Sequence, residues 1–209
     1  MNIGIIGTGN MGSALGRLWA SKGHAVFFGS RDPDRALVLG HSIGVMASGG
    51  TIAQAVKFAN VILLAVCWEA VPAALKAAGS LEGKVIIDCT NPMNSDWTRL
   101  VEGLNSSGAE RIAQLAPGAK VVKAFNHVYA QIIQSSPLFG SQNASVLYCG
   151  DDEDAKERVA CLIEDAGFDP VDSGVLQNAR YLEPIAEQMM QFAYVIGMGT
   201  DQAIKIIRR

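Results

Sequence analysis

Short apolar runs alternate along this chain with longer segments whose apolar residues recur at helical spacing. The apolar runs predict eight strands, at residues 2–6, 24–28, 45–47, 60–66, 84–89, 119–125, 145–149 and 168–172. Most of the segments between them carry one apolar face, as the stretch from Met11 to Trp19 does, which is typical of amphipathic helices. This alternation predicts an α/β fold with a doubly wound, mostly parallel sheet.

A glycine-rich turn joins the first strand to the first helix. Its sequence, Gly7-Thr8-Gly9-Asn10-Met11-Gly12, has the G-x-G-x-x-G pattern of Rossmann-type dinucleotide-binding folds. In that pattern the first glycine lets the chain leave the strand, the second lets a pyrophosphate approach the backbone, and the third lets the helix pack closely. The N–H groups at the helix start favour an anion. We therefore predict a bound dinucleotide, the alternative being a tight turn in some other α/β protein.

The end of the second strand bears on which dinucleotide binds. NAD-binding folds usually carry an acidic residue there for the ribose 2′-hydroxyl, whereas this chain carries Gly29-Ser30-Arg31. Glycine leaves room for a 2′-phosphate, Ser30 can donate a hydrogen bond, and Arg31 offers a charge-assisted fork. Arg35 lies one turn further and adds a second positive charge. We predict NADP(H), the alternative being a surface loop with solvated arginines.

Other strand ends supply further candidate contacts, because ligands of doubly wound sheets lie outside the carboxyl ends of the strands. Val66, Cys67 and Trp68 follow the fourth strand and are expected to border the cofactor. Trp68 either covers the ribose or part of the ring system, or packs on the sheet as a helix-start aromatic. Asn91 and Pro92 follow the fifth strand and should face the nicotinamide half.

Few residues are candidates for chemistry. Asn126 and His127 follow the sixth strand on the predicted ligand side, where they can position a carboxamide or a flavin carbonyl. Alternatively, Asn126 caps the next helix and His127 is an exposed first-turn residue. No metal-ligand spacing and no nucleophile elbow occurs, and we interpret Asp88, Asp172 and Glu183 as scattered structural acids. Transfer of a hydride between two stacked rings needs little beyond positioning, because the cofactors carry the chemistry.

The length of the chain limits the number of domains, and its net charge limits the class of partner. The 209 residues suit one compact domain, with a dinucleotide-binding core at residues 1–125 and with sheet completion and a small C-terminal helical extension at 126–209. A net charge of −3 gives no basic footprint for nucleic acid. We see no signal peptide, no membrane span and no C-x-x-C pair, so we expect a cytoplasmic protein without a membrane partner. Further helices are expected at residues 96–102, 108–115, 177–197 and 200–207.

Several segments resemble those of one family. They are residues 7–12, Gly29-Ser30-Arg31, Trp68-Glu69, Asn91-Pro92, Lys123-Ala124-Phe125-Asn126 and Asn178-Ala179-Arg180-Tyr181-Leu182-Glu183-Pro184. They occur in this order in the NADP oxidoreductases that depend on the deazaflavin coenzyme F-420. The oxidoreductase domain of the six-transmembrane epithelial metalloreductases is similar, and the resemblance covers essentially the whole chain.

The resemblance implies NADPH as cofactor, hydride transfer to a deazaflavin or flavin, and a homodimer built partly by the C-terminal helices. The implied cofactor contacts are Thr8, Asn10, Met11, Ser30, Arg31 and Arg35, and we add Ala124 from the matching segment. Where the deazaflavin enzymes carry a Leu-His-Thr type segment, this chain has Phe125-Asn126-His127, nearer the metalloreductase pattern. The acceptor therefore stays open among coenzyme F-420, FMN, FAD and another acceptor.

Two other functions compete with this hypothesis. The first is reduction of a small imine, as in pyrroline-5-carboxylate reductase, whose N-terminal turn reads similarly. That function needs a long helical dimerisation domain, and residues 174–209 are short for it. The second is a non-catalytic module that senses the NADPH/NADP ratio, with which sparse catalytic residues are compatible. Turnover with a flavin-type acceptor separates the three.

Overall fold

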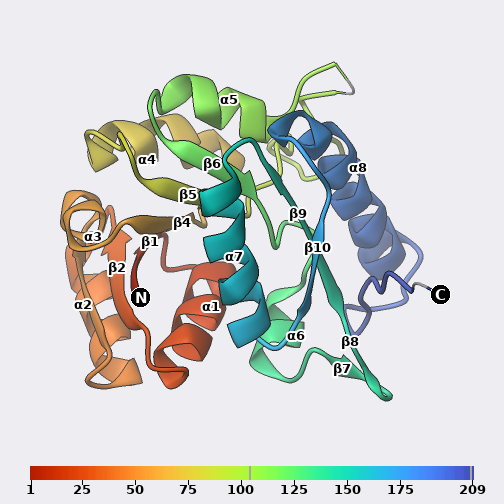
Figure 1. Ribbon diagram of the computed structural model, residues 1–209, viewed down its shortest axis with the longest axis horizontal. Coiled ribbons are helices and arrows are strands. Elements are labelled where there is room, and N and C mark those ends of the chain that lie inside the picture. The colour runs from red at the N-terminus through yellow and green to blue at the C-terminus, as the bar shows by residue number, and fades with distance from the viewer. Residues whose placement is uncertain (104, 208) are drawn as a thin grey trace.

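One sheet organises the molecule (Figure 1). In this computed structural model, which describes residues 1–103, 105–207 and 209, eight strands pair in the order β10-β9-β6-β5-β4-β1-β2-β3. Their bounds are β1 Asn2–Ile6, β2 Ala25–Ser30, β3 Ala47–Thr51, β4 Val61–Leu64, β5 Val85–Asp88, β6 Lys120–Lys123, β9 Ser145–Gly150 and β10 Asp169–Asp172. Neighbouring strands are parallel except β6 and β9. The mostly parallel sheet and its eight strands are confirmed, but the third strand spans Ala47–Thr51 and not residues 45–47.

Helices cover both faces of this sheet. Their bounds are α1 Asn10–Ser21, α2 Pro33–Ile43, α3 Ile52–Phe58, α4 Val71–Ala78, α5 Gly108–Leu115, α6 Ala130–Gln134, α7 Glu153–Asp165 and α8 Ala179–Met190. One buried cluster joins the strands to α1, α6 and α7, and a second joins them to α3, α4, α5 and α8. In Figure 1, α4 and α5 lie on one side of the sheet and α1 on the other. No helix in the described ranges is long and apolar enough to cross a bilayer.

The central strands are continuously apolar because they bury both faces. Ile5 and Leu63 pack into the first cluster, while Ile6, Ile62 and Leu64 pack into the second. All five side chains are at most 1% exposed. A strand covered on both faces needs apolar residues at every position, so the unbroken runs were sufficient to locate these strands.

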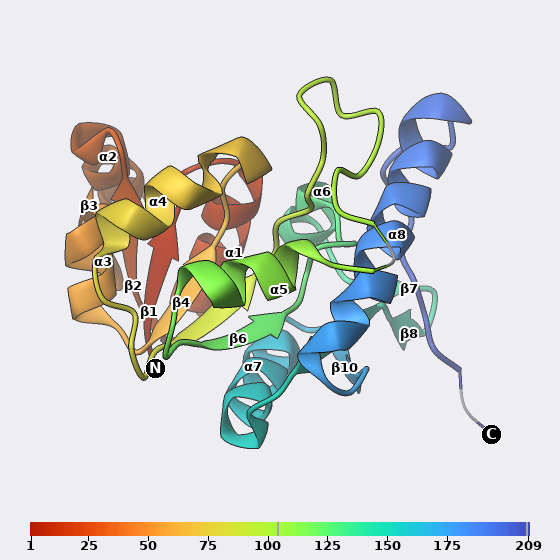
Figure 2. The same ribbon diagram turned by 90° about the horizontal axis from the view of Figure 1, so that it is seen from above.

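The predicted helix at residues 96–102 is wrong. Met93 and Leu100 form an isolated antiparallel bridge instead. Asn94 Oδ1 accepts the backbone N–H groups of Thr98 and Arg99 at 2.9 and 3.1 Å. Short polar side chains compete in this way for backbone groups that a helix would use. The segment is a polar loop, which Figure 2 shows standing beside α8.

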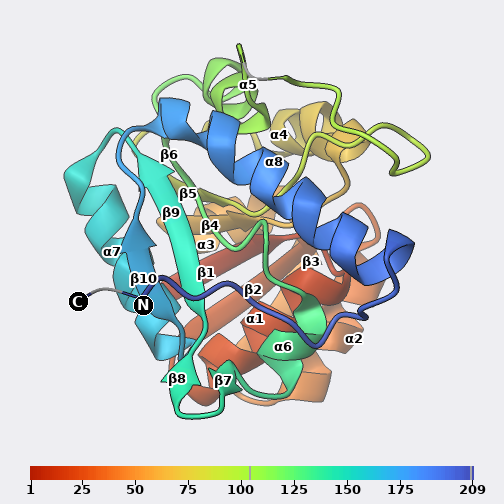
Figure 3. The same cartoon turned by 90° about the vertical axis from the view of Figure 1, so that its right-hand side faces the viewer.

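The C-terminal helices also differ from the prediction. The stretch expected to be helical at 177–197 divides into a 3₁₀ turn at Leu176–Asn178, α8, and a π-helical turn at Gln191–Val195. The predicted helix at 200–207 is wrong, because the chain there is not helical. Ile204 O instead accepts the backbone N–H of Ser145, at the start of β9, at 2.7 Å. In Figure 3, α8 crosses in front of the sheet.

The connection before β9 contains a short hairpin. Its two strands are β7 Leu138–Phe139 and β8 Gln142–Asn143, which pair antiparallel. Gly140 adopts a φ of 61° between them, which suits a glycine in a tight turn. The hairpin lies outside the main sheet and does not alter its order.

Candidate active site

A cavity of about 640 Å³ opens where β1, β4, β5 and β6 end. The glycine-rich turn borders it on one side, and the end of α8 with the π-helical turn borders it on the other. Its lining comprises Gly9, Asn10, Met11, Ala65, Val66, Cys67, Cys89, Asn91, Trp97, Phe125, Asn126, His127, Val128, Tyr129, Ala130, Gln131, Ala186, Met189, Met190 and Tyr194. This is the edge at which doubly wound sheets bind ligands.

The three motif glycines have the geometry that the sequence pattern predicts. A Cβ at Gly7, where φ is 121°, would lie 2.1 Å from Ala65 O, and a Cβ at Gly12 would lie 2.4 Å from Gly7 O. At Gly9, in contrast, no heavy atom of a described residue lies within 4 Å of the Cβ position. Two of the glycines therefore permit close packing, and the third leaves open space over the start of α1.

The start of α1 is available to an anion. No side chain caps it, and its first turn contains no acidic residue. The first N–H groups of a helix have no partner within the helix, so here they remain free for a ligand. Asn10 and Met11 border the cavity beside them. Thr8 is half-buried in the turn, outside the cavity lining.

Two arginines lie beside the turn without side-chain partners. Gly7 N–H donates to Gly29 O at 2.9 Å, which places the end of β2 next to the motif. Ser30 is half-buried, and its Oγ accepts the backbone N–H of Asp32 at 3.1 Å. Arg31 and Arg35 are exposed, and among the described residues neither guanidinium makes a hydrogen bond or ion pair. Both charges are therefore available to a phosphate.

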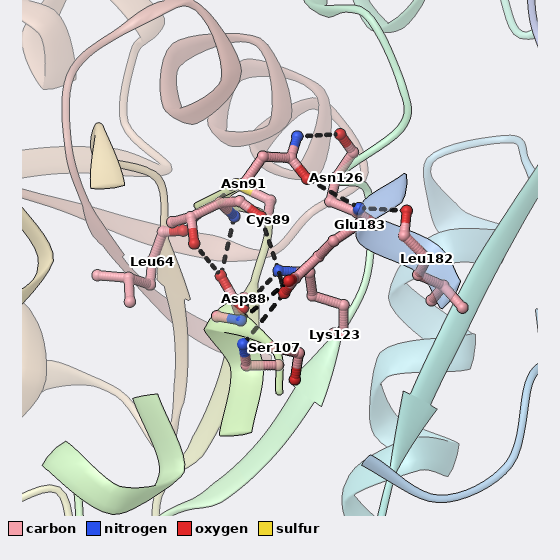
Figure 4. A network of polar contacts seen from close by, with 12 residues as sticks. Leu64, Asp88, Cys89, Asn91, Ser107, Lys123, Asn126, Leu182 and Glu183 are labelled. Carbon is pink, nitrogen blue, oxygen red and sulfur yellow. Dashed lines mark hydrogen bonds and ion pairs between the residues drawn. The ribbon is translucent and has the colours of Figure 1, made fainter. Parts of the chain in front are cut away.

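Asn91 and Asn126, which follow two different strands, hydrogen-bond to each other in the cavity wall (Figure 4). Asn91 Nδ2 donates to Asn126 O at 2.8 Å, and Asn126 Nδ2 donates to Asn91 Oδ1 at 3.0 Å. Asn126 Nδ2 also donates to Leu182 O of α8 at 3.0 Å. The alternative that Asn126 caps the next helix is wrong, because Tyr129 occupies the N-cap position of α6.

His127 is a buried, neutral part of the wall. The residue is only 5% exposed, so the alternative that His127 is an exposed first-turn residue is wrong. Nε2 accepts the backbone N–H of Leu147 in β9 at 3.0 Å. Burial lowers the pKa of His127 to about 4, although hydrogen bonds oppose this shift. The ring is thus neutral at physiological pH and does not supply a proton there.

The buried histidine predicts a specific loss of stability in acid. Because the ordinary pKa is 6.5 and the folded value is about 4, the unfolded chain binds more protons between these values. The free energy of unfolding should therefore fall as the pH drops through this window, by roughly 3 kcal/mol, and level off below it. In urea unfolding, His127→Gln should lose most of this pH dependence, whereas the exposed-site control His41→Gln should retain it. Equal pH dependence in the two variants would contradict the assignment.

A buried ion cluster lies behind the asparagines (Figure 4). Lys123 Nζ contacts Asp88 Oδ2 at 2.8 Å, Glu183 Oε1 at 2.7 Å and Thr90 O at 2.7 Å. The side chains of Lys123 and Asp88 are 0% exposed, and that of Glu183 is 2% exposed. Burial by itself lowers the pKa of Lys123, but the two carboxylates outweigh it and raise the pKa above its ordinary value. The lysine therefore stays charged.

The cluster fixes the position of α8. Besides its ion pair, Glu183 accepts the backbone N–H groups of Gly108 and Ala109, at 2.9 and 3.1 Å, where α5 starts. One carboxylate thus joins β6, α5 and α8. Asp88 and Glu183 are structural, as interpreted, but they are not scattered, because the fold brings both onto Lys123. The signal that could have indicated this is Lys123, which stands between the apolar pairs Val121-Val122 and Ala124-Phe125.

The other predicted contacts divide into two groups. Val66 and Cys67, which were expected to border the cofactor, line the cavity. Trp68 does not; it packs in the second core cluster, and its ring lies 3.1 Å from the Cβ position of Gly108. Pro92 is buried, and Ala124 is fully buried in the first cluster, both outside the lining.

Sequence reasoning missed the opposite wall of the cavity. Trp97, Tyr129, Met189, Met190 and Tyr194 form it. The Tyr129 hydroxyl donates to Met189 O at 2.5 Å, and the rings of Tyr129 and Tyr194 meet edge-to-face with centroids 6.5 Å apart. These residues come from three separate segments. The available signal was the apolar stretch from 185 to 199. It lies at the end of a helix and carries more apolar side chains than an exposed helix end needs.

The turn, the sheet order and the cavity define a dinucleotide-binding Rossmann protein. The sequence pattern of the family described as NADP oxidoreductase, coenzyme F-420-dependent, matches residues 2–92. The F-420-dependent NADP reductase of Methanothermobacter marburgensis is 31% identical over 201 residues, which cover 88% of this chain and 89% of that protein. The chain belongs to the coenzyme F-420-dependent NADP oxidoreductase family, and it is an NADP-dependent oxidoreductase that binds NADP(H).

Two further comparisons extend the relationship. Metalloreductase STEAP3 of Rattus norvegicus is 35% identical over 188 residues, and the match covers 90% of this chain but only 37% of that protein. The crystal structure of a putative F-420-dependent NADP reductase from Arthrobacter sp. FB24 superposes with a TM-score of 0.89 at 29% identity, covering 100% of both chains. Both parts of the predicted resemblance are therefore confirmed.

Proposed function

We propose that this chain transfers a hydride between NADP(H) and a flavin-type acceptor, which is coenzyme F-420, FMN or FAD. The observation that carries the proposal is the lining of the cavity, which joins the glycine-rich turn to an apolar wall and includes no Asp, Glu, Lys or Arg among the described residues. Reduction of an imine or carbonyl group calls for a positioned proton donor. Transfer between two rings depends chiefly on holding them in alignment.

Three titratable groups of the lining, two of them buried and one half-buried, support this view. Burial raises the pKa of Cys89 to about 12 and that of Tyr129 to about 12, and it lowers the pKa of His127 to about 4. An efficient general acid or base has a pKa near the working pH. None of these three groups meets that requirement, so we assign them to the architecture of the wall.

The residues at the turn fit NADP(H). The open space at Gly9 accommodates a pyrophosphate against the uncapped start of α1, and Ser30, Arg31 and Arg35 supply a site for a 2′-phosphate. When bound, NADPH supplies the hydride from its nicotinamide ring. We place that ring in the cavity beside Asn91 and Asn126.

The opposite wall suits a flat acceptor ring. Met189, Met190 and Tyr194 present apolar and aromatic surface, and Trp97 adds the face of its indole ring from the polar loop. Thioether and aromatic side chains pack well against planar rings.

The homodimer stays a prediction. We assign its interface to an exposed apolar surface beside this wall, formed by Val195, Ile196 and Met198, which are 72%, 62% and 62% exposed.

Arg31→Ala should separate the two dinucleotides. Because the Arg31 guanidinium has no partner among the described residues, its removal should leave the fold intact and take away only the contact with the 2′-phosphate. We expect NADP⁺ binding to weaken by about 1.5–3 kcal/mol, as for a charged hydrogen bond, and NAD⁺ binding to change little. Isothermal titration with both dinucleotides measures this. Equal losses for NADP⁺ and NAD⁺ would refute the assignment of the phosphate site.

A panel of acceptors tests the proposed reaction. The purified protein with NADPH is incubated with F-420, FMN, FAD or the cyclic imine 1-pyrroline, and NADPH oxidation is followed optically. We expect oxidation with at least one flavin-type acceptor and none above background with the imine. Oxidation only with the imine would favour the imine reductase. NADPH binding without oxidation by any of the four would favour the sensing module.

A further inference from the structure

One hydrogen-bonding atom in the cavity wall lacks a partner. The side-chain oxygen of Asn126, Oδ1, is buried and accepts no hydrogen bond from any described residue. The residue is 7% exposed and borders the cavity. Nearly all buried polar atoms in folded proteins are paired. An orphaned acceptor at a ligand site therefore points to a donor that the ligand brings.

The orientation of this amide is set by its neighbours (Figure 4). The backbone oxygen of Leu182 can only accept, so the atom that faces it at 3.0 Å is Nδ2. The second N–H of Nδ2 goes to Asn91 Oδ1. A rotation of the amide by 180° would turn its oxygen toward two other acceptors. Asn126 therefore has an acceptor to offer and no donor.

Asn91 holds the orphaned oxygen in place. Its own Nδ2 donates to the backbone oxygen of Asn126 at 2.8 Å, so the two residues are joined by reciprocal hydrogen bonds. Leu182, the third partner, precedes Glu183 in α8, which the buried Lys123 anchors. The acceptor is thus held by the same contacts that fix α8 to the strand ends. A pre-positioned group of this kind orients a ligand at little entropic cost.

We infer that Asn126 Oδ1 accepts a hydrogen bond from the carboxamide NH₂ of the nicotinamide ring and so sets the rotation of that carboxamide. A flavin carbonyl does not fit, because it only accepts. The imide N–H of a flavin-type ring shares the donor chemistry, and binding measured with no acceptor present separates these two sources. The inference rests on the proposed placing of the nicotinamide ring, and not on which acceptor is reduced.

Three dinucleotides that differ only at the carboxamide test this contact in the unaltered protein. They are NADP⁺, its 3-acetylpyridine analogue, in which CH₃ replaces NH₂, and its nicotinic acid analogue, in which a carboxylate replaces the amide. By isothermal titration, we expect the acetyl analogue to bind about tenfold more weakly than NADP⁺, as for one lost hydrogen bond. The carboxylate analogue should bind more weakly still, because two acceptors then face each other. Equal binding of NADP⁺ and either analogue would overturn the inference.

A variant assigns the effect to Asn126. In Asn126→Ala, the ratio of NADP⁺ affinity to acetyl-analogue affinity should fall to near one. Ser30→Ala is the matched control, because it lies at the far end of the cofactor and should leave the ratio unchanged. A ratio that survives in Asn126→Ala would overturn the assignment. If that variant does not fold, the analogue series in the unaltered protein decides.

The result also distinguishes this inference from the proposed function. Tight NADP⁺ binding without discrimination among the analogues overturns the role of Asn126 and leaves the hydride transfer standing. Failure to bind any of the three dinucleotides overturns the proposed cofactor site, and the inference falls with it. Loss of flavin reduction with intact discrimination overturns the acceptor assignment alone.

Discussion

Gly9→Val is expected to abolish NADP(H) binding while the chain stays folded. In the part of the chain that the structure describes, no heavy atom lies within 4 Å of the Cβ position, and the backbone at Gly9, with φ −79° and ψ −171°, suits any residue. The valine methyl groups would occupy the space over the α1 N–H groups that we assign to the pyrophosphate. We expect the affinity for NADPH to fall by at least about a hundredfold, measured by fluorescence titration, with an unchanged melting temperature.

Gly12→Val provides the contrast at the same motif. Its Cβ would lie 2.4 Å from Gly7 O, so this variant should lose both stability and binding. Loss of binding in both variants, with loss of stability in Gly12→Val alone, separates the ligand space from the packing contact. Unchanged NADPH affinity in Gly9→Val would mean that the dinucleotide lies elsewhere.

Lys123→Met is expected to destabilise the fold severely. It leaves the carboxylates of Asp88 and Glu183 buried without their shared cation. Breaking a buried ion pair by removing one partner costs about 3–5 kcal/mol, which is a large part of the 5–15 kcal/mol that typically stabilises a domain, by rough estimate. Urea unfolding of the variant should show this loss as a lower transition midpoint.

The same strand supplies a matched control for that experiment. Lys120 pairs with Asp152 at 2.8 Å, but the two side chains are 39% and 34% exposed. Exposed pairs contribute about 1 kcal/mol or less, so Lys120→Met should shift the midpoint only slightly. Equal destabilisation by the two substitutions would contradict the account of the buried cluster.

The parts of the fold that were predictable from sequence depend on local signals. Buried parallel strands need apolar residues on both faces, so the run from Val61 to Leu64 could be located by inspection. The glycine motif specifies a turn within six residues, and the geometry at Gly7 and Gly12 follows from sterics. Likewise, the absence of an acid at the end of β2 is visible in the sequence because it concerns one strand end.

The parts that could not be predicted depend on distant partners. Lys123 meets Glu183 across 60 positions of sequence, and no local pattern pairs them. The position of Asn126 suggests a helix cap, but its amide donates a hydrogen bond to Leu182 O of α8, 56 residues away in the sequence. The segment 96–102 is a polar loop and not the predicted helix, because Asn94 competes for its backbone N–H groups, and this competition is not visible in the sequence.

The most direct test of the central claim is an isotope measurement on NADPH deuterated at C4. Two samples carry deuterium on opposite faces of the nicotinamide ring, and single-turnover oxidation of each is followed with the best acceptor of the panel. If the cavity holds the two rings in one alignment, deuterium on one face should slow the oxidation several-fold and deuterium on the other face should not. Oxidation that neither deuterium slows, or the absence of oxidation with F-420, FMN and FAD alike, would contradict it.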